Sequence, residues 1–156
     1  MANLVDVVAY IIDSYPHKSE LSNARVTKMV YLADWKNSID RGSQLSTIDW
    51  FFDDYGPYVS DVQDAVRACP SVFEIVLSNN MFGGKKTLFQ RTATPYTPTL
   101  SKDERSAIDA VIETTQSMNW NAFIQFVYAT HPIAHSERYS KLDLPKLAEE
   151  YRAILV

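Results

Sequence analysis

The chain has 156 residues, a length that predicts a single domain over residues 1–156. Its content of 46% hydrophobic and 22% charged residues is typical of a globular chain and excludes a largely disordered one. The formal net charge of −4 argues against non-specific binding to nucleic acid, because such binding needs a net basic face.

The chain begins with a predicted helix, because its apolar residues recur at spacings of three and four until Pro16 ends the pattern. This apolar stripe consists of Leu4, Val5, Val8, Ile11, Ile12 and Tyr15. Asp6 and Asp13 interrupt the run and no basic segment precedes it, so a signal peptide is not expected. No charge-free stretch approaches the roughly 18 residues that span a bilayer. We therefore expect a soluble, cytoplasmic protein with no membrane partner.

A second helix is predicted from about Ser22 to Asp40, with Gly42 beyond it as a stop signal. The apolar residues of its middle, KMVYLADW at 28–35, occupy more than one face, which indicates a central helix covered on most sides. The following segment, QLSTIDWFF at 44–52, is compatible with a short helix capped at Ser46 or Thr47, or with an extended segment.

Pro57 predicts the first turn of another helix, whose stripe of valines ends near Cys69 and Pro70. Residues 71–92 predict a β-hairpin, because the β-rich runs SVFEIVLS and KTLFQR flank NNMFGGK, which is rich in Asn and Gly. A connector with two prolines, TPYTPT at 94–99, follows the hairpin.

The second half returns to helical patterns. Ser101 and Glu104 form a capping box at the start of one helix. Another helix is expected from Trp120 to the His131-Pro132 pair, and Asp143 is expected to cap a last helix. We expect the final residues 153–156 to pack on the core. The predicted fold is mainly α with a small β-hairpin (α+β), a compact single-domain bundle of about six helices.

The sequence offers no set of residues typical of catalysis or metal binding. His131 and His135 have the spacing of a helical metal pair, but Pro132 is expected to break the helix between them. The single cysteine, Cys69, lies at a predicted helix end, where we expect a small buried residue and not a reactive thiolate. The glycines at 83–84 lack the spacing of a phosphate-binding loop. We therefore predict no catalytic residue, no metal ligand and no cofactor.

One stretch, DWFFDDYGPYVSDV at 49–62, places aromatic and acidic residues beside a Gly-Pro turn. Adjacent aspartates near such a turn usually face water, and Tyr and Trp supply contact area at protein interfaces. The rings of residues 50–52 point in different directions, so some of them should enter the core. We predict a partner-binding surface at this stretch. It comprises Trp50, Asp53, Asp54, Tyr55, Gly56, Pro57, Tyr58, Asp61 and Asp64.

Two blocks of this sequence resemble the Panacea antitoxin domain, also called the SocA-like antitoxin domain. Lys28, Tyr31, Leu32 and Ala33 match a helix of the type K-L-x-Y-L-A, and Tyr55, Gly56 and Pro57 match the Y-G-P-V segment that opens another helix in the family. Thr130-His131-Pro132 resembles a later T-x-P stretch, so the resemblance covers about residues 20–140. The chain departs from the family at Tyr58, where a valine is commoner.

The resemblance implies a non-enzymatic antitoxin whose partner is a cognate protein toxin. Such domains neutralise toxins of unrelated chemistry, including toxins that modify nucleotides or tRNA, and many occur in phages, prophages and other mobile elements. We expect direct binding, in which Asp53, Asp54, Asp61 and Asp64 steer the encounter with a basic toxin.

Two alternatives remain. The first is a proteolytic adaptor that delivers a toxin to a protease and uses the apolar residues 153–156 as a second binding surface. The second is a small enzyme that depends on His131 or His135. A nucleic-acid partner is not expected, although Lys85, Lys86 and Arg91 could form a small basic tip.

Overall fold

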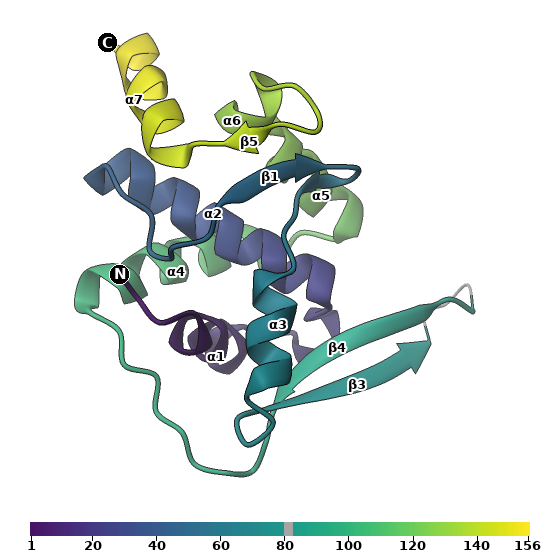
Figure 1. Cartoon of the computed structure of the whole chain (residues 1–156). Helices are drawn as coiled ribbons and strands as arrows, with labels where there is room; N and C mark the ends of the chain where they lie inside the picture. The colour runs from purple at the N-terminus through teal and green to yellow at the C-terminus, as the bar shows by residue number, and fades with distance from the viewer. Residues whose placement is uncertain (80–82) are drawn as a thin grey trace.

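The computed structural model describes residues 1–79 and 83–156, so residues 80–82 of the predicted hairpin loop lie outside the described part (Figure 1). The described helices are α1 (Leu4–Ser14), the 3-10 helix η1 (Lys18–Glu20), α2 (Asn23–Arg41), α3 (Asp61–Ala68), α4 (Lys102–Thr115), α5 (Trp120–Ala129), α6 (His131–Ala134) and α7 (Leu144–Leu155). The described strands are β1 (Trp50–Asp53), β2 (Gly56–Pro57), β3 (Phe73–Asn79), β4 (Lys85–Arg91) and β5 (Lys141–Leu142). The predicted class, mainly α with a small β component, is confirmed.

Helix α2 crosses the middle of the molecule, with α1, α3, α4 and α7 arranged around it (Figure 1). Ser22 caps its start by accepting a hydrogen bond from the backbone N–H of Arg25 at 3.2 Å. Gly42 ends it with a φ of 80°, in the left-handed region that favours glycine. Because α2 buries residues on nearly every face, the prediction of a central helix is confirmed.

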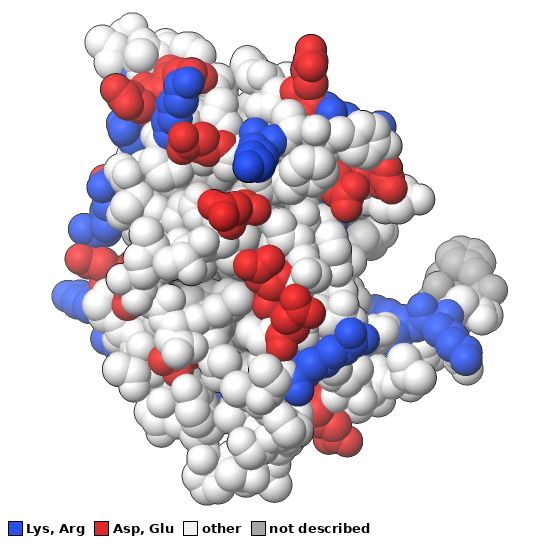
Figure 2. Space-filling model, in the orientation of Figure 1, with Lys and Arg blue, Asp and Glu red and all other residues white. Residues whose placement is uncertain are grey.

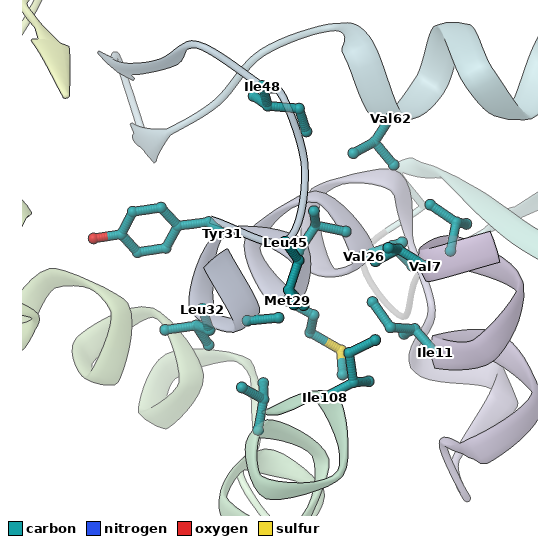
Figure 3. Packing of buried hydrophobic residues seen from close by; sticks show 14 of the residues in the cluster. Val7, Ile11, Val26, Met29, Tyr31, Leu32, Leu45, Ile48, Val62 and Ile108 are labelled. Carbon is teal, nitrogen blue, oxygen red and sulfur yellow. The ribbon is translucent and has the colours of Figure 1, made fainter. Parts of the chain in front are cut away.

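The core forms where α2 meets helices that lie far from it in sequence. Met29 points toward Ile11 of α1 and Ile108 of α4, whereas Tyr31 points to the opposite side (Figure 3). Val62 of α3 also packs into this cluster (Figure 3). The apolar stripes read from the sequence therefore meet at α2.

A three-stranded sheet of order β2-β1-β5 lies beside α2 and settles the open choice for residues 44–52, which are extended at their end. The prediction that Pro57 begins a helix is wrong. Pro57 lies in β2 opposite Phe52, and α3 starts at Asp61. The helix begins later because Tyr58 N–H donates to Phe51 O at 3.0 Å, which continues the strand pairing past the proline.

Strands β3 and β4 form the predicted hairpin, with Phe73 opposite Arg91 and Asn79 opposite Lys85. One end of the hairpin is joined to the body because Phe89 N–H donates to Leu21 O at 2.9 Å. Its other end projects away from the helices (Figure 1). The hairpin is therefore an arm beside the helical body.

The capping signals of the second half are confirmed. Ser101 and Glu104 form a capping box on α4, and Asp143 accepts from Lys146 N–H at the start of α7. Residues 153–156 were expected to pack on the core, but they are exposed, because α7 buries only Leu144 and Ala148, nearer its start. Cys69 is half-buried against the core. Within residues 1–79 and 83–156, no helix has both the length and the apolar character needed to cross a membrane.

The fully buried carboxylate of Asp34, on α2, holds the segment that leads to β1. It accepts hydrogen bonds from the backbone N–H groups of Leu45 and Ser46 at 2.8 and 2.9 Å, from Ser46 Oγ at 2.5 Å and from Trp50 Nε1 at 2.8 Å. Burial raises the pKa of Asp34, and the hydrogen bonds from Ser46 and Trp50 lower it. The net effect is a raised pKa at Asp34. Three of the four groups, the two backbone N–H groups and the indole N–H, can only donate, so the carboxyl oxygens of Asp34 serve as their acceptors.

We expect Asp34→Ala to lower the free energy of unfolding by at least about 3 kcal/mol, because it leaves four donors without their acceptor and each orphaned buried group costs about 1–3 kcal/mol. Chemical denaturation measures the change. Asp40→Asn, at an exposed acid of the same helix, is the matched control and should stay within about 0.5 kcal/mol. A loss below about 1 kcal/mol in Asp34→Ala would contradict this role.

Candidate partner-binding site

The turn between β1 and β2 carries the most exposed of the predicted contact residues. Asp53 pairs with Gly56, which leaves Asp54 and Tyr55 at the tip. Gly56 has a φ of 98°, in the region that favours glycine. Tyr139 fixes the turn, since its hydroxyl donates to Asp54 Oδ1 at 2.5 Å. The side chain of Tyr55 is 80% exposed although its backbone lies in this fixed turn.

Three of the predicted contact residues do not offer a side chain to a partner. Trp50 is only 1% exposed, so its predicted docking role is wrong: its indole N–H is committed to Asp34 and its ring packs edge-on against Tyr31. Gly56 and Pro57 are buried and set the direction of the chain. The aromatic residues that enter the core are thus Trp50 and Phe52.

A pocket of about 460 Å³ opens beside the turn. Three separate segments build it: the first half of α2, the turn with the residues that follow it, and α5. It is lined by Ala24, Lys28, Asp53, Asp54, Tyr55, Tyr58, Trp120, Ile124 and Tyr128. Four of the predicted contact residues, Asp53, Asp54, Tyr55 and Tyr58, therefore lie together on one concave surface.

Lys28 is the cation of this pocket. Its side chain is 3% exposed, and among the residues that the structure describes it has no hydrogen-bond or ion-pair partner. Burial lowers the pKa of Lys28 to about 8, and the charge of Asp53 opposes part of this shift. The charged form of this ammonium group is costly, because burial removes much of its hydration and no acceptor among the described residues replaces it.

The aromatic wall of the pocket is fixed by its own contacts. Tyr58 OH accepts from Asn23 Nδ2 at 3.1 Å, which ties the residue after β2 to the start of α2. Tyr128 packs edge-on against Phe52, with ring centroids 6.3 Å apart. Trp120 stacks on the buried Phe123 and remains 44% exposed at the mouth. Such preset rings lose little entropy when a partner covers them.

Asp61 and Asp64 lie outside the pocket lining. Both are exposed in the first turn of α3, where a negative charge complements the helix dipole, and Asp64 also accepts from Ser60 Oγ at 3.1 Å. The predicted acidic set is therefore divided between the pocket mouth and the start of α3. Their exposure keeps both groups available to act on a partner at long range.

A second hollow of about 780 Å³ adjoins the pocket, and the two share Ala24 and Trp120 as lining residues. Lys85 and Lys86 of β4 lie on its far side. Figure 2 shows acidic side chains gathered at the β1–β2 turn and basic ones along the β3–β4 hairpin, with a hollowed surface between them. The face thus has an acidic edge, an aromatic floor and a basic edge.

The histidine pair lies elsewhere, between α5 and α7. Pro132 was expected to break the helix between His131 and His135, but it lies in the first turn of α6, where proline is tolerated. The two rings are therefore close, with centroids 4.2 Å apart. The pKa of His131 is lowered, mainly by burial and to a smaller extent by the neighbouring His135. The ring of His131 packs against Trp35. The described residues contain no group of three side chains able to hold a metal ion.

The predicted contact set did not include Lys28 or the three α5 residues of the pocket, Trp120, Ile124 and Tyr128. For these α5 residues the sequence predicted only a helix, since nothing local indicates that one of its faces lies beside the turn. A signal for Lys28 was present, because a lysine in a helix predicted to be covered on most sides is uncommon unless it is paired or functional.

The sequence profile of the family described as "Antitoxin SocA-like, Panacea domain" matches residues 26–132. The chain belongs to this family, and the resemblance found in its sequence is confirmed. No curated protein and no solved structure gives a significant match to the chain. Membership supports an antitoxin role and implies a toxin partner in general.

We expect Lys28→Met to raise the free energy of unfolding at pH 7 by about 2–3 kcal/mol, because it removes a buried charge whose pKa falls from 10.5 to about 8. Between pH 8 and 10.5 the unfolded lysine keeps a proton that the native one has lost. Wild-type stability therefore rises with pH through this window relative to the variant. Urea denaturation of both proteins at pH 7, 8 and 9 measures the difference.

The matched control for this prediction is Lys36→Met, which removes a half-exposed lysine that pairs with Asp40 on the same helix. It should leave both the stability and its pH dependence nearly unchanged. A Lys28→Met protein that is less stable than the wild type at pH 7 would refute the assignment of a costly buried ammonium.

Proposed function

We propose that this protein is an antitoxin that neutralises a cognate protein toxin by direct contact and without catalysis of its own. The docking surface is the pocket around Lys28 together with the acidic turn and the start of α3. The observation that carries the proposal is that Asp53, Asp54 and Tyr55 share one pocket with Lys28 in a member of an antitoxin family. Lys28 is buried there and has no partner in the described part of the chain.

Charge supports a partner with a basic active site. Toxins that act on nucleotides or RNA need basic surfaces to bind phosphate, and an acidic protein surface can compete for such a site. Asp54 and Asp61 are exposed and extend this acidic surface from the turn to α3. Tyr55 and Trp120 supply exposed aromatic area next to these charges, which is the composition of many interface centres.

The histidine pair gives little support to the enzyme alternative. His131 is nearly buried, and it packs between Trp35 and Tyr151. A general base must reach the proton that it abstracts, and the Nε2 atom of His131 is buried. We therefore interpret the histidine pair as a packing contact between α6 and α7, and not as a catalytic pair.

Charge reversal tests the steering role. The double variant Asp54→Lys/Asp61→Lys should associate about 10-fold more slowly with the toxin encoded by the neighbouring gene at about 0.01 M salt, where the screening length is about 30 Å. The difference should shrink at about 0.15 M, where that length is about 8 Å. Stopped-flow or surface-binding kinetics at the two salt concentrations measure both rates.

The control for charge reversal is Glu113→Lys/Glu149→Lys, which changes the net charge by the same amount at exposed positions of α4 and α7. It should change association only slightly. If both double variants slow association equally, net charge and not this surface steers the encounter. If the wild-type protein captures no product of the neighbouring gene and restores no growth, the antitoxin proposal itself fails.

One observation favours the adaptor as a second candidate. Ile154 and Leu155 are both 65% exposed in the last turn of α7, which lies far from the β1–β2 turn and the β3–β4 hairpin (Figure 1). An adaptor needs such a second surface. If the protein is an adaptor, the toxin is degraded only when this chain and the protease are both present, and Ile154→Ser/Leu155→Ser stops degradation without weakening toxin binding. Neutralisation in a strain without the protease would exclude the adaptor.

A further inference from the structure

The pocket contains an unmet hydrogen-bonding requirement that limits what can occupy it. Lys28 lines it with three ammonium donors, is 3% exposed, and has no acceptor among the described residues. Leaving a buried charge unpaired lowers the stability of the folded protein. An occupant that brings an acceptor to Lys28 therefore removes a cost already present in the free protein.

The aspartates at the mouth do not meet this requirement. Asp53 is the nearest opposing charge, yet it forms no ion pair with Lys28 within the described structure. Asp54 already accepts from Tyr139 OH at 2.5 Å. The two carboxylates therefore give the mouth of the pocket its negative charge. Lys28, in the buried part of the lining, has no partner among the described residues.

The remaining lining is apolar and of suitable size. Trp120, Ile124 and Tyr128 of α5, together with Tyr58, surround a volume of about 460 Å³. Pockets of about 300–1,000 Å³ accommodate small ligands or whole side chains. The group that fits this pocket is therefore a negatively charged hydrogen-bond acceptor on an apolar stem. The acidic mouth of the pocket favours basic residues next to that group.

We propose that the pocket receives one acidic side chain of the toxin, whose carboxylate pairs with Lys28 while its methylene stem packs against Tyr58 and Tyr128. This inference rests on the proposed antitoxin function and names the anchor of the complex. Basic residues that flank the acid in the partner would meet Asp53 and Asp54 at the mouth. The pair between this carboxylate and Lys28 fixes the position of the toxin on the docking surface, and the flanking charges assist the approach of the toxin.

The test uses the full-length protein and three probes of equal shape: 3-phenylpropionate, 3-phenylpropionamide and 3-phenylpropylamine. The indole N–H of Trp120 reports occupancy in ¹H–¹⁵N spectra, because Trp35 and Trp50 are buried. At pH 7 the carboxylate should bind about 10-fold or more tightly than the amide and the amine, the size expected of a charge-assisted hydrogen bond. Lys28→Met should remove this preference, and Lys36→Met should retain it.

The same titration at pH 9 adds a second readout. The titratable groups that face Lys28 are Asp53 and Asp54 from the turn, the phenols of Tyr55 and Tyr58, and Tyr128 from α5. The preference for the carboxylate should fall between pH 7 and pH 9 in the wild type and in Lys36→Met. An amine that binds as tightly as the carboxylate, a preference that survives in Lys28→Met, or no response at Trp120 would overturn the inference.

Failure here and failure of the antitoxin proposal give different results. Lys28→Met should weaken binding of the neighbouring gene's product by about 10-fold or more, with dissociation faster and low-salt association little changed. A toxin that binds the wild type and Lys28→Met equally well refutes the anchor but leaves the antitoxin function standing. A toxin that binds neither protein refutes the antitoxin function, whatever the probes show.

Discussion

The geometry of the docking surface depends on one buried carboxylate. Asp34 accepts hydrogen bonds from the segment before β1 and from Trp50, the first residue of that strand, so a loop that could lie in many ways is held against α2. Strand β1 then positions the turn that bears Asp54 and Tyr55. The acceptor and its donors are all fully buried. Any other arrangement of this segment would therefore leave several of these polar groups without a hydrogen bond.

Three polar residues of α2 recur at intervals of three, and each has a different task. Asp34 holds β1, and Tyr31 joins α2 to the end of α5 through a 2.8 Å hydrogen bond with Thr130. Lys28 does neither, and it has no partner within residues 1–79 and 83–156. Two of the three therefore stabilise the fold, and the third is a destabilising group beside a pocket. Stability alone would favour an apolar residue at position 28, so the reason for a lysine there has to lie in what the pocket binds.

Local signals in the sequence were sufficient to predict most of the helices and the hairpin, because a capping box such as Ser101 with Glu104 acts within one turn of chain. They were not sufficient to predict the strands at the site. A two-residue strand such as β5 has no periodicity, and Pro57 fits a strand or the start of a helix until its partner Phe52 is known. The inward direction of Trp50 follows from Asp34, which lies sixteen residues away in sequence and is adjacent only in the fold.

The two kinds of charge at the pocket act over different distances, which resolves their apparent conflict. The exposed carboxylates at the mouth act through water over about a Debye length, roughly 8 Å at physiological salt, and so influence how a partner approaches. Lys28 is largely buried and acts mainly on an atom that enters the pocket, where Coulomb interactions are stronger than in water. A basic surface is attracted first, and only one that also carries an acidic side chain in the right place gains the second interaction. Attraction alone would suit many basic proteins, whereas the combination of an acidic rim and a buried cation discriminates among them.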